Sequence, residues 1–275
     1  MKIENKVALV TGGADGIGKA VSQCLLEKGA KTLVRLCYLF RIEVLYCNLK
    51  FATSGNQFRS FNVSRPTYTQ GKAGLFISKL RGVHFFSILF VAILDINEDL
   101  GKETVNKFSE KFGSNKVRFI HCNVADDKKL KECFQEAFDV FGTLDIVVNN
   151  AGVATANHRR AIEINLIAVI NGCFYAEELM TKQKREEKGV IVNTASMAGL
   201  MTGAAYVNSN YYAAKHGVVG LTKSLPISSD EFSKDLRVAA ICPALVLTSI
   251  FKSQDVMDDE KMKKCVESSL EYEVK

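Results

Sequence analysis

Short apolar runs alternate along the chain with longer stretches in which apolar residues recur every three or four positions. The run at residues 6–10 precedes such a stretch, and the alternation resumes at 91–95 and continues to 236–241. Runs of this length predict buried strands, and the stretches between them predict amphipathic helices. Strands that alternate with helices are typical of a parallel sheet with helices on both faces. The pattern therefore predicts the α/β class, as a doubly wound parallel sheet of the Rossmann type.

Six strands and the main helices can be placed from this pattern. The strands are expected at residues 6–10, 91–95, 117–122, 144–148, 190–194 and 236–241. Helices are expected at 98–112 and 126–141, with Asp126 as the N-cap of the second, and around Asn165 and Tyr211. Pro226 falls where the Tyr211 helix would continue. We expect a kink or an end there, because a proline inside a helix costs about 3 kcal/mol.

One segment breaks the alternation. Residues 32–90 show neither helical nor alternating spacing, and they hold eight of the 17 phenylalanines. A doubly wound fold needs its second strand soon after the first helix, yet the apolar run that ends in an acid comes only at Asp95. We interpret 91–95 as the second strand and 32–90 as an anomalous insertion in a single domain that spans residues 1–275. The alternatives are a second strand at 32–40, a surface subdomain, or the translation of an unspliced intron.

Composition and charge narrow the class of protein. Hydrophobic residues make up 47% and charged residues 24%, as in ordinary globular proteins. The net charge of +6 does not predict nucleic-acid binding, because residues 32–90 alone carry +7. The longest apolar run, 85–94, is too short to span a bilayer, and no signal region opens the chain. The eight cysteines include no CxxC pair and no zinc-like grouping with histidine. We expect a cytoplasmic protein with reduced cysteines, no metal, no nucleic-acid partner and no membrane span.

A glycine-rich turn lies between the first strand and the first helix. Its glycines are Gly12, Gly16 and Gly18, with Asp15 and Ile17 between them. Gly12 permits a tight turn, Gly16 lets the backbone approach a pyrophosphate, and Gly18 allows close packing of helix on strand. The helix that follows presents free N–H groups and the positive end of its dipole to phosphate. The turn therefore favours a dinucleotide as ligand.

Tyr211 and Lys215 lie four residues apart, so on a helix they share one face. An ammonium beside a phenol stabilises the phenolate and lowers the pKa of the phenol from about 10 toward neutrality. A phenol tuned in this way can act as a general base. Ser196 follows the apolar run 190–192, where its hydroxyl could polarise the same substrate oxygen. The spacing alone also occurs by chance on ordinary helices, so the rest of the chain has to support this interpretation.

Polar and special residues gather where the predicted strands end. Asp95, Asn123, Asn149, Ser196 and Pro243 each follow an apolar run. The carboxyl ends of parallel strands meet at one edge of a sheet, where open α/β sheets bind their ligands. We therefore expect these residues and the glycine turn to form one site.

Four motifs carry a family resemblance: Thr-Gly-x3-Gly-x-Gly from Thr11, Asn-Asn-Ala-Gly from Asn149, Ser196, and Tyr-x3-Lys from Tyr211. Together they resemble the single-domain short-chain dehydrogenase/reductase family, over residues 1–31 and 91 to about 255. The resemblance implies that Tyr211 is the general base and that Lys215 lowers its pKa and holds the nicotinamide ribose. It implies that Ser196 binds the reacting oxygen and that Asn165 orders a water in the proton relay. The residues it assigns to the cofactor are Gly12, Asp15, Gly16, Ile17, Gly18, Asp95, Asn123, Val124, Asn149, Ala151, Tyr211, Lys215, Pro243 and Thr248.

Charge indicates which form of the cofactor to expect. Asp95 can accept hydrogen bonds from both hydroxyls of an adenosine ribose and would repel a 2′-phosphate, and Asp15 adds to that repulsion, so the resemblance implies NAD. Two residues depart from the family pattern, Asn123 in place of Asp and Ala244 in place of Gly. The chain also ends at Lys275, before a further helix and edge strand that the family normally supplies. We expect a truncated C-terminal end and an exposed edge on the sixth strand.

The function that the resemblance implies is the transfer of a hydride to NAD from a secondary alcohol on an apolar chain, of the hydroxyprostaglandin kind. The implied partners are a small-molecule alcohol or ketone and, for an intact member of the family, a second copy of the chain. Met197, Met201, Tyr206 and Asn208 are candidates to line the substrate pocket. The alternatives are a catalytically inactive nucleotide-binding or scaffold protein, and a mis-spliced product of such an enzyme.

Overall fold

The structure, a computed structural model, describes residues 6–28, 43–46, 89–183, 187–201, 209–228, 230–244, 246 and 248–252. The chain divides into two units, Met1–Asn48 together with Ser87–Lys275, and Leu49–Phe86; all described residues belong to the first. Most of the proposed insertion, the alternative second strand at 32–40 and the segment 253–275 lie outside the described residues. The limits of the insertion and the single-domain organisation therefore stay predictions.

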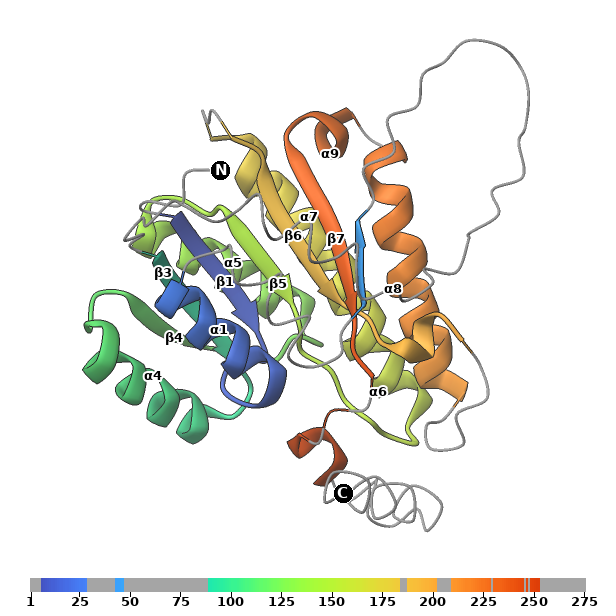
Figure 1. The fold of residues 1–275 in the computed structure, drawn as a ribbon, viewed down its shortest axis with the longest axis horizontal. Coiled ribbons are helices and arrows are strands. Elements are labelled where there is room, and N and C mark those ends of the chain that lie inside the picture. The colour runs from blue at the N-terminus through green and yellow to red at the C-terminus, as the bar shows by residue number, and fades with distance from the viewer. Residues whose placement is uncertain are drawn as a thin grey trace, which may run out of the picture. The chain divides into compact units, whose positions relative to one another are not determined.

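Seven strands form one sheet in the order β2-β7-β6-β5-β1-β3-β4 (Figure 1). The six parallel strands are β1 (Lys6–Thr11), β3 (Leu89–Asp95), β4 (Val117–His121), β5 (Ile146–Asn149), β6 (Gly189–Thr194) and β7 (Leu236–Cys242). All six strands expected from the apolar runs are present, and the doubly wound parallel sheet is confirmed. The strand order reverses beside β1, which lies between β3 and β5.

The second strand of the parallel sheet is β3. It pairs with β1 on one side, Thr11 opposite Leu94, and with β4 on the other, Asp95 opposite His121. The interpretation of 91–95 as this strand is confirmed, and Asp95 is its last residue.

The outer edge of β7 is covered, so the expected exposed edge was wrong. β2 (Glu43–Tyr46) pairs with β7 in the antiparallel sense, Glu43 opposite Cys242 and Tyr46 opposite Ala239 (Figure 1). An edge strand offers a row of unpaired N–H and C=O groups that any extended segment can satisfy. Six residues of the segment predicted to be an insertion are thus part of the sheet, the four of β2 and Leu89 and Phe90 at the start of β3.

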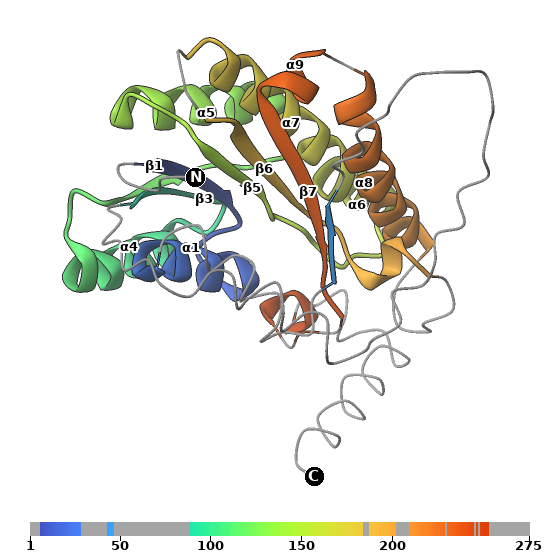
Figure 2. The same cartoon turned by 45° about the horizontal axis from the view of Figure 1, so that its top comes forward.

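Helices cover both faces of the sheet (Figure 2). One face packs against α1 (Gly16–Lys28) and α4 (Glu98–Phe112). The other packs against α5 (Asp127–Phe141), α7 (Ala168–Thr181) and α8 (Ser209–Ser228). Each face has its own buried core.

The two cores follow from the alternation of side chains along the strands. In β1, Val7 and Leu9 lie in the core beneath α5, α7 and α8, whereas Ala8 and Val10 lie in the core beneath α1 and α4. Both faces of a central strand are therefore apolar, which explains why it appears in the sequence as an unbroken apolar run.

The remaining elements are short. They are α6 (His158–Ile162) and the π-helical turn η2 (Glu163–Ile167), which run into α7, and η3 (Met197–Gly199), α9 (Asp230–Lys234) and η4 (Ser249–Lys252). Asp126 caps α5 as expected, its Oδ1 accepting a hydrogen bond from the Lys129 N–H at 3.0 Å. Pro226 lies inside α8, in its last turn, and the helix continues to Ser228, so the expected kink or end at the proline stays a prediction. None of the described helices is long and apolar enough to cross a membrane.

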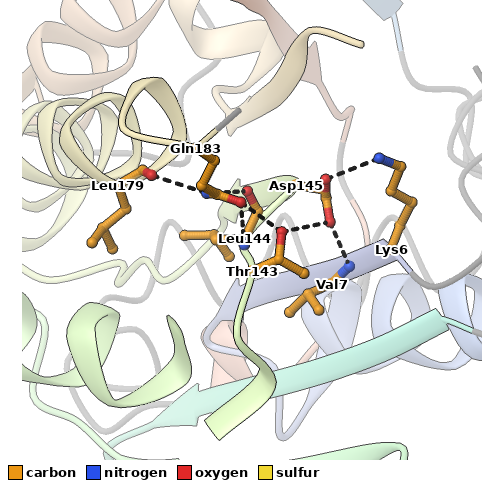
Figure 3. A network of polar contacts seen from close by, with 7 residues as sticks. All are labelled: Lys6, Val7, Thr143, Leu144, Asp145, Leu179 and Gln183. Atoms are coloured by element: carbon orange, nitrogen blue, oxygen red, sulfur yellow. Dashed lines mark hydrogen bonds and ion pairs between the residues drawn. The ribbon is translucent and has the colours of Figure 1, made fainter. Parts of the chain in front are cut away.

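Asp145 joins β5 to β1 at the amino ends of the strands (Figure 3). Its carboxylate accepts hydrogen bonds from the Val7 backbone N–H at 3.0 Å and from the Lys6 ammonium at 3.1 Å. Thr143 Oγ1 donates to Gln183 Oε1 at 2.6 Å and lies 3.5 Å from Asp145 Oδ2. Because Gln183 follows α7, this network fastens two strands and a helix at the end of the sheet opposite the strand ends expected to form the site.

Replacing Asp145 by asparagine is expected to lower the free energy of unfolding by about 1–3 kcal/mol, because the buried Val7 N–H and the Lys6 ammonium lose their charged acceptor. Urea denaturation followed by circular dichroism measures the effect. Asp139→Asn, at an exposed position of α5, is the matched control and should change the free energy by less than about 0.5 kcal/mol. Equal effects of the two substitutions would show that the network adds no stability.

Candidate active site

The carboxyl ends of the parallel strands open into one cavity of about 1060 Å³. The glycine turn, the ends of β3 to β6, the start of α8 and the segment after β7 all contribute to its lining. The expected site residues that line it are Gly12, Asp15, Gly16, Ile17, Asp95, Asn123, Val124, Ala151, Asn165, Ser196, Tyr211, Lys215, Pro243 and Thr248. Gly18 and Asn149 are not among the lining residues, for different reasons.

The glycine turn depends on backbone positions that side chains would block. Gly12 and Gly16 have φ of 62° and 52°, in the left-handed region. A Cβ at Gly18 would overlap the carbonyl oxygen of Gly12, so α1 starts directly against the turn. From the end of β5, Asn150 Nδ2 donates to the carbonyls of Thr11 and Gly12 at 3.1 and 3.2 Å. Gly18 therefore shapes the cavity by allowing this close approach without lining it.

Two carboxylates mark the glycine-turn end of the cavity. Asp95 Oδ2 accepts a hydrogen bond from the Ala14 N–H at 3.0 Å, and its Oδ1 accepts one from the Asn97 N–H at 3.0 Å. These bonds hold the carboxylate beside the turn, in which Asp15 also lines the cavity. The basic residues of the described lining all come from α6 and α8 instead. A sugar with free hydroxyls fits this end better than one that carries a phosphate.

The two residues expected beside the adenine, at the end of β4, line the cavity. Asn123 Oδ1 accepts a hydrogen bond from the Ala125 N–H at 3.2 Å, and Val124 lines the cavity beside it. The amide that replaces the family's aspartate is therefore engaged with the backbone of its own turn.

Asn149 does not reach the cavity, so its expected place beside the cofactor was wrong. Its side chain is buried, and Nδ2 donates to Asn193 Oδ1 at 2.9 Å; Asn193 Nδ2 donates in turn to Thr222 Oγ1 at 3.0 Å. Asn149 shares its face of β5 with Val147, which belongs to the core beneath α7 and α8. Strand alternation therefore turns this amide away from the site, and Asn150 lines the cavity instead.

Ser196, Tyr211 and Lys215 come together in the cavity wall. The Tyr211 hydroxyl is hydrogen-bonded to Ser196, whose Oγ also accepts a hydrogen bond from the Ala198 N–H at 3.1 Å. Lys215 Nζ lies 5.7 Å from the centre of the Tyr211 ring and donates to the Thr194 carbonyl at 2.8 Å. The end of β6 thus positions both the serine and the lysine around the phenol.

Burial is the largest influence on the pKa values of Tyr211 and Lys215. It lowers the pKa of Lys215, which is 3% exposed, to about 8. It raises the pKa of the Tyr211 phenol above its usual value near 10, and the hydrogen bond with Ser196 acts in the opposite direction. The pKa of Tyr211 is therefore raised overall and not lowered as expected, because burial is the dominant effect on it. The contact that favours the phenolate is the one with Ser196.

Asn165 lies in η2, within the long helix where it was expected. Its buried amide donates from Nδ2 to the Val153 carbonyl at 2.9 Å and accepts at Oδ1 from the Val153 N–H at 3.0 Å. These two bonds fix the loop after Gly152 against the helix. Single π-helical turns are frequent at functional sites. The expected role in ordering a water stays a prediction.

The segment after β7 approaches the glycine turn. The Pro243 carbonyl accepts a hydrogen bond from the Met197 N–H at 2.9 Å, which joins the segment to η3. The Thr248 side chain stands 3.2 Å from where a Cβ on Gly16 would lie. Ala244 lines the same cavity, as do Met197 and Met201, whereas Tyr206 and Asn208 lie outside the described residues.

Sequence reasoning missed three charged residues of the lining, Arg159, Arg160 and Glu163. They follow Asn157, whose Oδ1 caps α6 by accepting a hydrogen bond from the Arg160 N–H at 3.1 Å. Two arginines in the first turn of the helix that an N-cap asparagine begins were the signal available in the sequence.

Comparison with known proteins agrees with this geometry. The family model described as short chain dehydrogenase matches residues 88–259, more than half of the chain. The chain belongs to the short-chain dehydrogenase family. This short-chain dehydrogenase is 33% identical to 15-hydroxyprostaglandin dehydrogenase (NAD(+)) of Macaca fascicularis and of Homo sapiens, over 97% of its own length and 77% of theirs. It is an oxidoreductase, and small molecules are its substrates.

More distant similarities extend over nearly the same length. The short-chain dehydrogenase is 26% identical to zerumbone synthase of Zingiber zerumbet, over 91% of this chain and 72% of that protein. Among solved structures it resembles a short-chain dehydrogenase/reductase of Burkholderia phymatum in complex with NAD, with a TM-score of 0.64 and 22% identity. That match covers 93% of this chain and 71% of the other, and it supports the fold.

Proposed function

We propose that this short-chain dehydrogenase oxidises a secondary alcohol on an apolar chain, of the hydroxyprostaglandin kind, to the ketone with NAD+ as hydride acceptor. The observation that carries the proposal is the contact between the Tyr211 hydroxyl and Ser196, beside Lys215, in a cavity bordered by the glycine turn. Similarity to two NAD(+)-named 15-hydroxyprostaglandin dehydrogenases supports the kind of substrate and the cofactor.

The glycine-turn end of the cavity fits a dinucleotide. Gly12 and Gly16 leave bare backbone at the turn, and the N-terminus of α1 offers N–H groups to a pyrophosphate. Asp95 would accept hydrogen bonds from ribose hydroxyls and repel a 2′-phosphate. When bound, NAD+ supplies the nicotinamide ring that accepts the hydride. The other residues proposed to contact it are Asp15, Ile17, Asn123, Val124, Ala151, Tyr211, Lys215, Pro243 and Thr248.

The residues of the chain itself handle the proton and the oxygen. Tyr211, as phenolate, takes the proton of the substrate hydroxyl, and Ser196 donates a hydrogen bond to the oxygen as it becomes a carbonyl. The alcohol loses this proton together with the hydride and becomes the ketone. Lys215 places a positive charge near the phenolate, although burial limits that charge at alkaline pH.

Absorbance of NADH during incubation with a panel of secondary alcohols, including hydroxy fatty acids, tests the proposal. We expect turnover with NAD+ and much slower turnover with NADP+. A protein that binds NADH and turns over none of the panel would contradict the proposal and favour the inactive nucleotide-binding alternative.

The close approach at Gly18 gives a separate prediction. Gly18→Ala is expected to weaken NADH binding by at least about tenfold and to lower the free energy of unfolding by about 1–3 kcal/mol, because the methyl group displaces the Gly12 carbonyl. Gly220→Ala is the control, since nothing beyond its chain neighbours and the backbone of its own helix lies within 4 Å of where its Cβ would be. That substitution in α8 should leave binding unchanged and add about 0.5–1 kcal/mol of stability. Normal NADH binding by the Gly18 variant would contradict the assigned place of the pyrophosphate.

We also infer that the protein is a cytoplasmic homodimer. Ile167 and Phe174, on the helix formed by η2 and α7, are 43% and 48% exposed, and a second copy could cover them. Light scattering coupled to size-exclusion chromatography measures the assembly state, and a monomer at micromolar concentration would contradict the dimer. The cytoplasmic location rests on the sequence and stays a prediction.

A further inference from the structure

The charges that line the cavity differ between its two ends. Asp15 and Asp95 belong to the glycine turn and to the end of β3. Among the described lining residues, the basic ones are Arg159, Arg160 and Lys215. The Lys215 ammonium is buried and donates to the Thr194 carbonyl, so the two guanidinium groups are the positive charges left to meet a ligand.

The two arginines lie on the alcohol side of the cavity. They belong to α6, which packs against α8, the helix that carries Tyr211 (Figures 1 and 2). Asn210 Nδ2, at the start of α8, donates to the Thr155 carbonyl at 3.3 Å, which joins the segment before α6 to the same helix.

Neither arginine is paired with a carboxylate within the described part of the protein. Both residues are exposed, and no ion pair joins either guanidinium to a described carboxylate. Glu163 lies one turn further along and also lines the cavity, yet it pairs with neither. A guanidinium group matches the two oxygens of a carboxylate, with which it can form two parallel hydrogen bonds. The apolar lining that such a substrate chain would meet includes Val153, Ala154, Met197 and Met201.

We propose that Arg159 and Arg160 bind a carboxylate on the substrate, so that the enzyme oxidises hydroxy acids whose hydroxyl and carboxylate are separated by an apolar chain. The inference rests on the proposed function and adds to it the two residues that determine specificity. The inference predicts that the substrate carboxylate lowers KM and has little effect on kcat, because the carboxylate lies away from the reacting carbon.

Kinetics with a hydroxy fatty acid and its methyl ester test this specificity. The unchanged enzyme should use the acid with a kcat/KM at least about tenfold higher than the ester, through KM. In the variant Arg159→Gln/Arg160→Gln this preference should fall to near unity, with kcat for the ester unchanged. Arg237→Gln, at an exposed position near the amino end of β7, is the matched control and should keep the preference. Glu163→Gln should lower KM for the acid, because it removes a repelling charge.

Equilibrium dialysis with radiolabelled decanoate, which has no hydroxyl to oxidise, separates this inference from the proposed function. Binding should weaken at least about tenfold in the double arginine variant and not in Arg237→Gln. Arginine-dependent decanoate binding by a protein without dehydrogenase activity would support the anion site and refute the proposed function. Equal use of acid and ester by an active enzyme, or decanoate binding that ignores the arginines, would overturn the inference.

Discussion

Tyr211→Phe is expected to lower kcat for alcohol oxidation by about 10²–10⁴-fold, the range of a lost general base. The substitution removes one oxygen and leaves the ring beside Lys215, so the fold should not change and NADH binding should weaken only by the loss of one hydroxyl contact. Tyr175→Phe is the matched control, because the Tyr175 hydroxyl bonds to Asp127 on the surface, away from the cavity. Oxidation by the Tyr211 variant within a few-fold of the unchanged enzyme would refute the proposed base.

The same base makes the rate depend on pH. Burial raises the pKa of Tyr211, so the phenol is protonated at neutral pH in the free protein. Below that pKa, the phenolate fraction rises about tenfold with each pH unit, and kcat/KM for oxidation should rise with it. The residual rate of Tyr211→Phe should lack this rise. A pH-independent kcat/KM in the unchanged enzyme would show that another group takes the proton.

The central strands could be predicted from the sequence because they bury both faces, whereas β4, at the edge of the sheet, exposes Arg118 and His121. In a chain with helical spacing between its apolar runs, an unbroken run such as 6–10 is typical of a strand inside a parallel sheet. Asp95, the acid at the end of the run, identified β3 despite the long segment before it. A carboxylate is expected at a strand end that faces a ligand and not inside an apolar core. Strand β2 could not be predicted in this way. Its four residues gain their structure from the free edge of β7 and not from a pattern of their own.

The sequence predicted correctly those residues that line the cavity because they lie at a strand end. It failed for residues whose place depends on the direction in which the side chain points. The residues after β3, β4 and β6 had to meet at one edge of the sheet, and they do. Asn149 was misplaced although the alternation with Val147 and Val148 was available to show which face it shares. The partner of the Lys215 ammonium could not be deduced, because Thr194 offers a backbone carbonyl that no side-chain pattern reveals.

Lys215→Met is expected to lower kcat/KM by at least about tenfold while removing an electrostatic cost from the folded protein. Burial lowers the pKa of Lys215 from 10.5 to about 8, and each pKa unit corresponds to 1.36 kcal/mol. The buried ammonium thus costs about 3 kcal/mol at neutral pH. Methionine keeps the apolar stem and removes the charge, but it leaves the Thr194 carbonyl without its donor, which offsets about 1–3 kcal/mol of the gain.

The pH dependence of stability isolates this cost. Between about pH 8 and 10.5 the unfolded chain still holds the Lys215 proton that the folded protein has lost, so the free energy of unfolding should rise with pH. Below pH 8 both states are protonated, and the full cost is present. Urea denaturation from pH 7 to 10 should therefore show a rise of up to about 3 kcal/mol that Lys215→Met lacks, whereas Lys223→Met, at an exposed position of α8, should keep it. Parallel pH profiles for the unchanged protein and Lys215→Met would mean that the ammonium is not buried in solution.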